Sequence, residues 1–315
     1  MNGELCSKIR MTLADFEKLH KLRGIVNREN TGGSYYICNH HLGDTAIFCS
    51  MAKSIRNMKD MKITVVLEQR YQSIPKIFGL ESLIVDTPKY KGELEQTLFW
   101  IYLSLTNIFS KSKLLLSFSG FFEYIRRPRK IIYSDMYIRF MLSLDSHIEI
   151  PLSCIDSNFT TSPTEIKTEF LKYGLKIGRT VIISPESLSS KEIDRTFFIA
   201  LYQELEKVNY TPIINSSNKF WIENNFRNFF PDPMIFLHYA IISGYSVTAR
   251  NGISDLLSFT PGVKNIIIYS KDVPKDFIIG RTKEKLCTEI EEYFYAESSR
   301  EELVQKIIDS INISR

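Results

Sequence analysis

The chain has 315 residues, about twice the length of a typical single domain, so two domains are expected. Hydrophobic residues make up 44% of it and charged residues 24%, a globular composition that excludes a disordered, collagen-like or coiled-coil chain. Forty Lys and Arg against 36 Asp and Glu give a net charge of +4, too small and too dispersed to indicate nucleic acid as a partner.

The cysteines and the apolar segments indicate where the protein resides. Five cysteines lie far apart and form no CxxC pair: Cys6, Cys38, Cys49, Cys154 and Cys287. Such an odd, scattered set is typical of a reducing compartment and predicts neither a disulfide framework nor a zinc site. The N-terminus lacks the apolar core of a signal peptide. The most apolar stretch, Leu98–Phe122, is interrupted by Lys111 before the roughly 20 residues that a membrane span needs, so we expect a cytoplasmic protein.

Strand-like and helix-like segments alternate along the first half of the chain. The expected order is strand, helix, strand, short helix, strand and a closing strand, over Ser34–Cys38, Asp44–Met58, Lys62–Leu67, Tyr71–Phe78, Ser82–Val85 and Lys130–Ser134. This alternation is the βαβ pattern of a parallel sheet.

The alternation restarts after Pro151–Glu165, a segment rich in Pro, Ser and Thr that we interpret as a linker. The second half is expected to hold four strands, at Thr180–Ser184, Thr211–Asn215, Tyr245–Ala249 and Lys264–Ser270. Its expected helices are Arg195–Val208, Asp232–Ser243, Ser254–Phe259 and Arg300–Ile313. The sequence thus predicts two α/β domains, 1–160 and 161–315. Ligands of such sheets bind at the carboxyl ends of strands, here in a cleft between the domains.

The first turn whose residues could take part in a reaction lies between the first strand and the first helix. It contains His41, Gly43 and Asp44. Gly43 lacks a side chain, so a substrate can approach the backbone. Asp44 would lie at a helix N-terminus, where a negative charge is favoured, and could accept a proton from an attacking hydroxyl. The alternative is that Asp44 is a simple N-cap.

Two further turns are expected at the same edge of their sheet. After the strand ending at Ser184, small hydroxyls such as Ser187 precede Lys191 and could cradle a phosphate. The alternative is a solvated Ser-rich loop with an exposed Lys. After the strand ending at Ala249, a glycine turn with free N–H groups at a helix start could bind an anion. Arg250 would add a cation suited to a diphosphate, or it could instead pair with Asp255.

Several other sites are not supported. The chain has no GxGxxG after a strand, no GxxxxGK[ST] and no Asp-x-Asp pair, which argues against a dinucleotide site, a P-loop and a simple metal site. His238 lies within an apolar helical pattern, which is typical of a core histidine.

Taken together, these segments resemble a known family. HHLGDTAIFCSMAKSIR, KITVVLEQRY and FGLESLIVD resemble the opening of the heptosyltransferase-like glycosyltransferases (family nine) of bacterial surface-polysaccharide synthesis. In the second half, IISPESLSSKEID and ARNGISDLLSF follow in the order expected of that family. The resemblance lies in the order of motifs over nearly the whole chain, and the Leu-Gly-Asp turn is its most specific part.

The resemblance implies a GT-B fold, two Rossmann-like domains with parallel sheets facing across a cleft. The N-terminal domain would bind the acceptor, with His41 and Gly43 in its loop and Asp44 as the catalytic base. The C-terminal domain would bind a nucleotide-sugar donor. Its diphosphate would meet Ser187, Lys191, Arg250, Asn251, Gly252, Ile253 and Ser254, and its nucleoside would meet Ser216 and Glu223.

The chain departs from the family at two positions. Where the family carries Asp two residues before the glycine and His three after it, this chain has Arg250 and Asp255. The change points to a donor other than a heptose, with Arg250 contacting the diphosphate directly.

The resemblance further implies a single, inverting displacement without metal or cofactor, in lipopolysaccharide, O-antigen or capsule synthesis. The stretch Phe99–Arg129, aromatic with a basic end, could meet a lipid-linked acceptor at the membrane surface or form a buried helix with a solvated end. A nucleotide-sugar epimerase, a polysaccharide pyruvyl transferase and a non-catalytic binding protein stay open as alternatives. The oligomeric state is not predicted.

Overall fold

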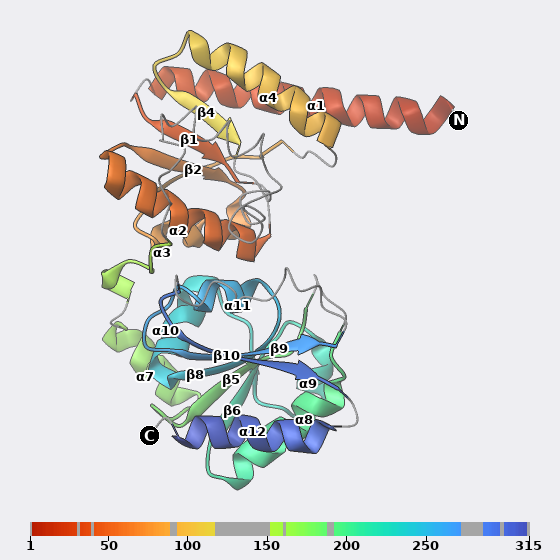
Figure 1. Cartoon of the computed structure of the whole chain (residues 1–315), viewed down its shortest axis with the longest axis vertical. Coiled ribbons are helices and arrows are strands. Elements are labelled where there is room, and N and C mark those ends of the chain that lie inside the picture. Colours follow the sequence, from red (N-terminus) through yellow and green to blue (C-terminus); the bar gives the residue numbers. More distant parts are fainter. Residues whose placement is uncertain are drawn as a thin grey trace. The chain divides into compact units, whose positions relative to one another are not determined.

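The computed structural model describes residues 2–29, 32–38, 41–88, 93–116, 152–159, 162–187, 192–271, 286–296 and 299–313. The chain divides into two compact units, residues 1–151 and 152–315, and the division falls at the first residue of the predicted linker (Figure 1). The strand predicted at Lys130–Ser134 and the basic end of the stretch Phe99–Arg129 lie outside the described residues.

The first unit is a parallel sheet with helices on both faces. Its elements are α1 (Asn2–Glu29), β1 (Ser34–Ile37), α2 (Leu42–Lys59), β2 (Ile63–Leu67), the 3-10 turn η1 (Gln69–Tyr71), α3 (Ser73–Ile77), β3 (Glu81–Ile84), α4 (Glu93–Ile108) and β4 (Lys113–Leu116). The strands run parallel in the order β3-β2-β1-β4. Both faces of a parallel sheet are covered, so β2 (ITVVL) is buried throughout and its sequence is a continuous run of mostly β-branched residues.

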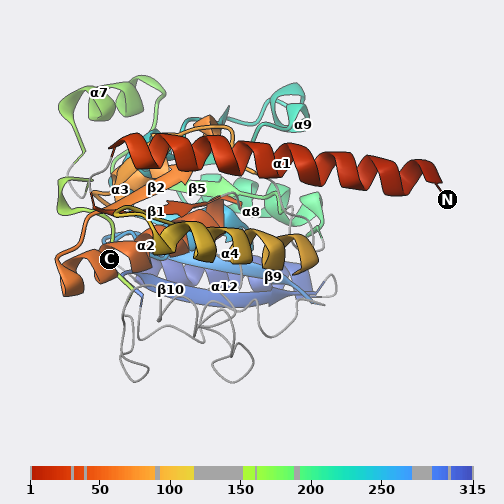
Figure 2. The same ribbon diagram turned by 90° about the horizontal axis from the view of Figure 1, so that it is seen from above.

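Helix α1 was not predicted, and it packs beside α4 on one face of the first sheet (Figures 1 and 2). The rings of Phe16 and Phe99 meet edge to face with centroids 4.6 Å apart. Arg23 is buried, and its guanidinium donates to the Asn107 side chain at 2.9 Å and to the Ser112 carbonyl at 3.2 Å. These contacts span more than 80 residues of sequence, so local periodicity does not reveal them.

The second unit is a larger sheet of the same type. Its elements are η2 (Ser157–Phe159), α7 (Thr164–Lys172), β5 (Thr180–Ser184), α8 (Arg195–Lys207), β6 (Thr211–Asn215), α9 (Lys219–Glu223), β7 (Asn228–Phe229), α10 (Pro233–Ser243), β8 (Tyr245–Ala249), α11 (Gly252–Leu257), β9 (Lys264–Ser270), β10 (Glu289–Tyr295) and α12 (Arg300–Ile313). The strand order is β10-β9-β8-β5-β6-β7, and every pairing is parallel.

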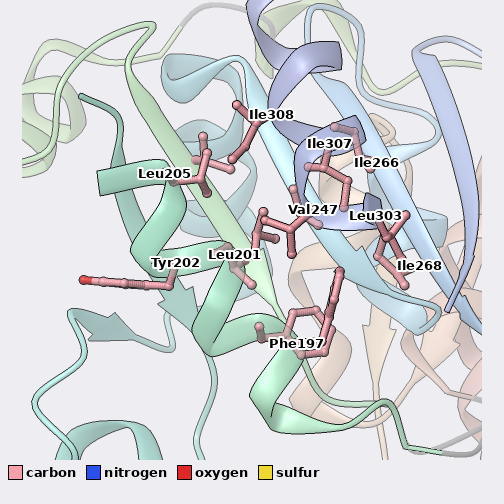
Figure 3. Close-up of a cluster of buried hydrophobic side chains, with 14 of the residues drawn as sticks. Phe197, Leu201, Tyr202, Leu205, Val247, Ile266, Ile268, Leu303, Ile307 and Ile308 are labelled. Carbon is pink, nitrogen blue, oxygen red and sulfur yellow. The ribbon is translucent and has the colours of Figure 1, made fainter. Parts of the chain in front are cut away.

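The main core of the second unit lies where α8 and α12 pack against one face of this sheet (Figure 3). Apolar residues at helical spacing along α8 and α12 meet β-branched residues of the central strands. The cluster includes Phe197, Leu201, Leu205, Val247, Ile266, Ile268, Leu303, Ile307 and Ile308. Its residues come from both ends of the unit, so the core joins the first strands to the last helix.

The cysteines of the second unit differ from what the sequence predicts. Cys154 and Cys287 form a disulfide across 133 residues, so the prediction that no disulfide forms is wrong for this pair. Backbone hydrogen bonds from Ile155 to Phe259 and from Cys287 to Ser258 bring both cysteines to the end of α11, a proximity that sequence spacing cannot show. In the first unit Cys38 and Cys49 are buried and not disulfide-bonded, as expected of cysteines that behave as small hydrophobic residues.

Candidate functional site

Strand order places a ligand site at one point in each sheet. In the first unit the order reverses between β1 and β4, and in the second it reverses between β5 and β8. Ligands of open parallel sheets bind outside the carboxyl ends of strands at such a point. The turn into α2 follows β1, and the turns after β5 and β8 both lie at the second reversal. All three turns singled out from the sequence therefore lie at these points.

The turn of the first unit presents Asp44 in the first turn of α2, as predicted. The N-cap position belongs to the exposed His41, whose side chain makes no capping hydrogen bond, so the alternative that Asp44 is a simple N-cap is wrong. Asp44 is half-buried, and Gly43 is buried within the helix. Both the amide and the hydroxyl of Thr45 donate to the His41 carbonyl at 3.0 Å, which fixes the start of the helix.

Polar residues after β2 adjoin this turn and were missed by the sequence analysis. Arg70 pairs with Glu68 at 3.0 Å and stacks over the Tyr71 ring at 4.7 Å from its centroid. Burial raises the pKa of Tyr71, and the negative charges of Glu68 and Asp44 raise it further against the opposing Arg70. The carboxylate of Asp44 therefore lies within electrostatic reach of the Tyr71 hydroxyl. Glu68, Arg70 and Tyr71 follow directly after the apolar strand β2, and this position is the sequence signal that could have identified them.

The two turns of the second unit are bonded to each other. The Ser187 hydroxyl donates to the Arg250 carbonyl at 2.5 Å. The side-chain amide of Asn251 donates to the backbone carbonyl of Glu186 at 2.7 Å. Ser187 and Asn251 thus come together at the reversal between β5 and β8. Lys191 lies outside the described residues.

Arg250 is buried, with 5% of its surface exposed. Its Nη1 donates to Asp255 at 2.8 Å, to the Asn251 carbonyl at 2.9 Å and to the Ser254 hydroxyl at 3.1 Å. This is the pairing with Asp255 that the sequence left open as an alternative. The guanidinium therefore holds the turn together from the inside.

Asn251 caps the start of α11. Its side-chain oxygen accepts from the amides of Ile253 at 2.9 Å and Ser254 at 3.1 Å, and the Ser254 hydroxyl accepts from the Asn251 amide at 3.2 Å. The expectation of free N–H groups at this helix start is therefore wrong for Ile253 and Ser254, because a reciprocal capping box satisfies them. Asn251, Gly252 and Ile253 are partly exposed, so the surface of the turn is accessible.

Of the two residues predicted on the nucleoside side, one precedes α9 and the other is its last residue. Ser216 follows β6 and is buried, and its hydroxyl accepts from the Asn218 amide at 2.9 Å. Glu223 is exposed at the last position of α9, the end away from β6. Between them, the buried Trp221 donates its indole N–H to the Glu186 side chain at 2.7 Å. Glu186 was not predicted as a site residue, since its contacts are 35 and 65 residues away in sequence.

Two kinds of feature are absent from the part of the chain that the structure describes. No three His, Cys, Asp or Glu side chains gather there in a way that could hold a metal ion. None of its helices combines the length and the apolar character needed to cross a bilayer. His238, predicted as a core histidine, is buried in α10 and stacks on Phe159.

Comparison with known proteins gives structural matches alone. No protein-family profile and no curated protein sequence matches the chain. A family 9 glycosyl transferase from Veillonella parvula matches with a TM-score of 0.59 and 13% identity, over 90% of this chain and 97% of that one. ADP-heptose lps heptosyltransferase II of E. coli matches with a TM-score of 0.62 and 11% identity, over 90% and 99%.

A third solved structure extends the comparison. E. coli heptosyltransferase WaaC with ADP-2-deoxy-2-fluoro heptose matches with a TM-score of 0.55 and 11% identity, over 90% of this chain and 99% of that one. At this identity the matches concern the fold. The α/β fold of GT-B type that the resemblance to heptosyltransferase-like proteins implies is confirmed: the chain has the fold of these glycosyltransferase structures.

Proposed function

We propose that the protein is a glycosyltransferase that moves a sugar from a nucleotide-sugar donor to a glycan or lipid-linked acceptor in bacterial surface-polysaccharide synthesis. One observation carries the proposal: all three turns that resemble family motifs lie at the strand-order reversals where such sheets bind ligands. The fold shared with glycosyltransferase structures supports it.

In this proposal Asp44 is the general base on the acceptor side. Its carboxylate is half-buried in the first turn of an 18-residue helix, whose dipole favours the ionised form. An ionised carboxylate can take the proton of the acceptor hydroxyl as that oxygen attacks the anomeric carbon. The nucleoside diphosphate leaves from the opposite face, so one displacement inverts the anomeric configuration. His41 and Gly43 border the acceptor.

The donor diphosphate would lie on the partly exposed turn Asn251–Ile253, with Ser187 and Lys191 beside it. The burial of Arg250 and its pairing with Asp255 favour a supporting role for that guanidinium in place of direct contact. A turn fixed in advance stabilises the charge of the leaving group without reorganising. Ser216 and Glu223 remain the proposed nucleoside contacts, and neither a metal nor a resident cofactor is required.

The acceptor side would also touch an anionic membrane surface through α4. Ile101, Leu105 and Ile108 lie at helical spacing and are each more than half exposed, as is the following Phe109. Residues 1–151 hold 21 Lys and Arg against 15 Asp and Glu, whereas residues 152–315 hold 19 against 21. An apolar stripe on a positively charged unit matches an anionic lipid surface.

Vesicle binding tests this contact. The double variant Leu105→Glu/Ile108→Glu should bind less to vesicles that contain phosphatidylglycerol, while Ile313→Glu, at an exposed apolar position of α12, should bind as the wild type does. Equal binding of all three proteins would contradict the membrane contact.

The function itself is tested by thermal unfolding with nucleoside diphosphates and nucleotide sugars, with and without Mg²⁺. A ligand at a hundred times its dissociation constant adds about 2.7 kcal/mol to the free energy of unfolding and raises the midpoint by about 2–10 °C. A selective rise without metal identifies the donor base, and ADP is the first choice because a WaaC structure contains it.

Product analysis then separates the alternatives. Transferred sugar supports the glycosyltransferase, an isomerised donor indicates an epimerase, and a ketal indicates a pyruvyl transferase. The absence of any nucleotide-induced shift would refute the proposal.

A further inference from the structure

The side chain of Glu186 is held by a buried tryptophan. Trp221 is fully buried, with Phe220 and Phe226 packed edge to face against its ring. A buried indole N–H requires an acceptor, and here that acceptor is Glu186 Oε1 at 2.7 Å. The helix α9, which follows β6, is thereby attached to the turn that follows β5.

The backbone of the same residue is held by the turn after β8. The side-chain amide of Asn251 donates to the backbone carbonyl of Glu186 at 2.7 Å. The hydroxyl of the neighbouring Ser187 donates to the Arg250 carbonyl at 2.5 Å. Glu186 thus connects α9, which carries the proposed nucleoside contact Glu223, to the proposed diphosphate turn. A shift of either element would move the other through this one residue.

The bond to Trp221 uses the carboxylate as an acceptor and does not need its charge. Among the described residues, no Lys, Arg or His pairs with Glu186, and the nearby Arg250 pairs with Asp255. A negative charge at this position opposes a bound diphosphate. An amide of the same shape would keep the hydrogen bond and remove that repulsion.

We propose that Glu186 is a positioning residue that joins the nucleoside side and the diphosphate side of the donor site into one preorganised unit. It acts through Trp221 and Asn251, and it does not touch the reacting atoms. The inference rests on the proposed function, since it assigns Glu186 a role at that donor site.

The test uses Trp221 as its own reporter. The chain has two tryptophans, so Trp100→Phe leaves Trp221 as the single fluorophore of the full-length protein. In this background Glu186→Gln should leave the Trp221 emission spectrum of the unliganded protein unchanged, because an amide oxygen still accepts the indole N–H. Glu186→Ala should shift the spectrum, because the indole N–H loses its acceptor. A spectrum unchanged in Glu186→Ala would overturn the link.

Nucleotide titration tests the positioning role with ADP or the diphosphate selected by thermal unfolding. Glu186→Ala should raise the dissociation constant about tenfold, as expected for the loss of one partly buried hydrogen bond. Glu186→Gln should bind at least as tightly as the wild type. In sugar transfer, Glu186→Ala should raise the donor KM with little change in kcat. Glu206→Ala, which removes an exposed carboxylate of α8, serves as the control.

The outcomes separate this inference from the proposed function. If the wild type binds no nucleotide, the function fails, while the spectra still test the Glu186–Trp221 link. If the wild type binds and Glu186→Ala binds equally well, the positioning role is overturned. If Glu186→Gln is as weak as Glu186→Ala, the charge itself contacts the ligand and the inference is also overturned. Should Glu186→Ala fail to fold, Trp221→Phe removes the same donor, and calorimetry should show the same loss of affinity.

Discussion

The turn into α2 and the turn into α11 each lie at the strand-order reversal of their sheet, yet their polar side chains differ in burial. In the first, His41 is exposed at an N-cap position without a side-chain cap, and Asp44 is half-buried. In the second, Arg250, Ser254 and Asp255 are all buried, and the guanidinium of Arg250 donates to both Ser254 and Asp255. The side chains of His41 and Asp44 are thus accessible in the first turn, whereas the side chains of the second turn hold backbone in place.

We interpret the first turn as the reactive one and the second turn as the preorganised one. A group that exchanges a proton with substrate has to remain accessible, whereas a surface that receives a leaving group works best when it is already fixed. Substitutions in the first turn should therefore change rates and leave stability alone. Substitutions in the second should change stability and donor affinity together.

The largest effect is expected from Asp44→Asn. Asn has the same shape but cannot accept the proton, so the rate of sugar transfer should fall about 10²- to 10⁴-fold with nucleotide affinity unchanged. Initial rates and thermal shifts measure the two quantities. Asp60→Asn, at the other end of the same helix, should leave both unchanged. Unimpaired transfer by Asp44→Asn would show that another group is the base.

The next effect concerns the buried pair of the second turn. Arg250→Met leaves Asp255 unpaired in the interior and should reduce the free energy of unfolding by about 3–5 kcal/mol. The double variant Arg250→Met/Asp255→Leu should lose less than the single one, because no charge stays buried. Urea unfolding measures both. A loss in Arg250→Met no larger than in Asp44→Asn would remove the contrast between the turns.

A smaller effect separates capping from attachment at Asn251. Asn251→Ala should lower the free energy of unfolding by about 1–2 kcal/mol through the lost N-cap. Asn251→Asp keeps the oxygen that caps Ile253 and Ser254 but loses the donor to Glu186, so stability should be retained and nucleotide affinity reduced. Chemical unfolding and nucleotide titration distinguish the two. Equal affinity in wild type and Asn251→Asp would show that the bond to Glu186 does not matter for the donor.

The smallest effect is a pH dependence confined to the second unit. Burial lowers the pKa of His238, whose Nδ1 finds no hydrogen-bond partner among the described residues. As pH falls through the ordinary histidine pKa of about 6.5, the unfolded chain takes up the proton first, so the folded state loses stability. The free energy of unfolding should fall by at most about 1.4 kcal/mol per pH unit, the limit for the uptake of one proton. His238→Phe should flatten the stability profile below pH 6.5, and an unchanged profile would point to another group.

Sequence patterns predicted what is local and missed what is distant. The strands β2, β5 and β8, which are buried throughout, could be predicted because parallel strands covered on both faces are rich in apolar and β-branched residues. Asp44 could be predicted because it follows a strand and lies in the first turn of a helix. By contrast, the disulfide and the Glu186–Trp221 bond join residues 133 and 35 positions apart, and no periodicity encodes either. For Arg250 the sequence offered both outcomes, and only three-dimensional packing selects Asp255.

The position of α12 in the core of the second unit affects the order in which the two units fold during synthesis. Leu303, Ile307 and Ile308 complete the core that supports β5, β8 and β9, so that core stays open until residues 300–313 have been synthesised. The unit that carries Asp44 contains none of these residues, and N-terminal domains fold first as a chain emerges from the ribosome. Under the proposed function, a nascent chain would therefore carry its general base well before it could hold a nucleotide.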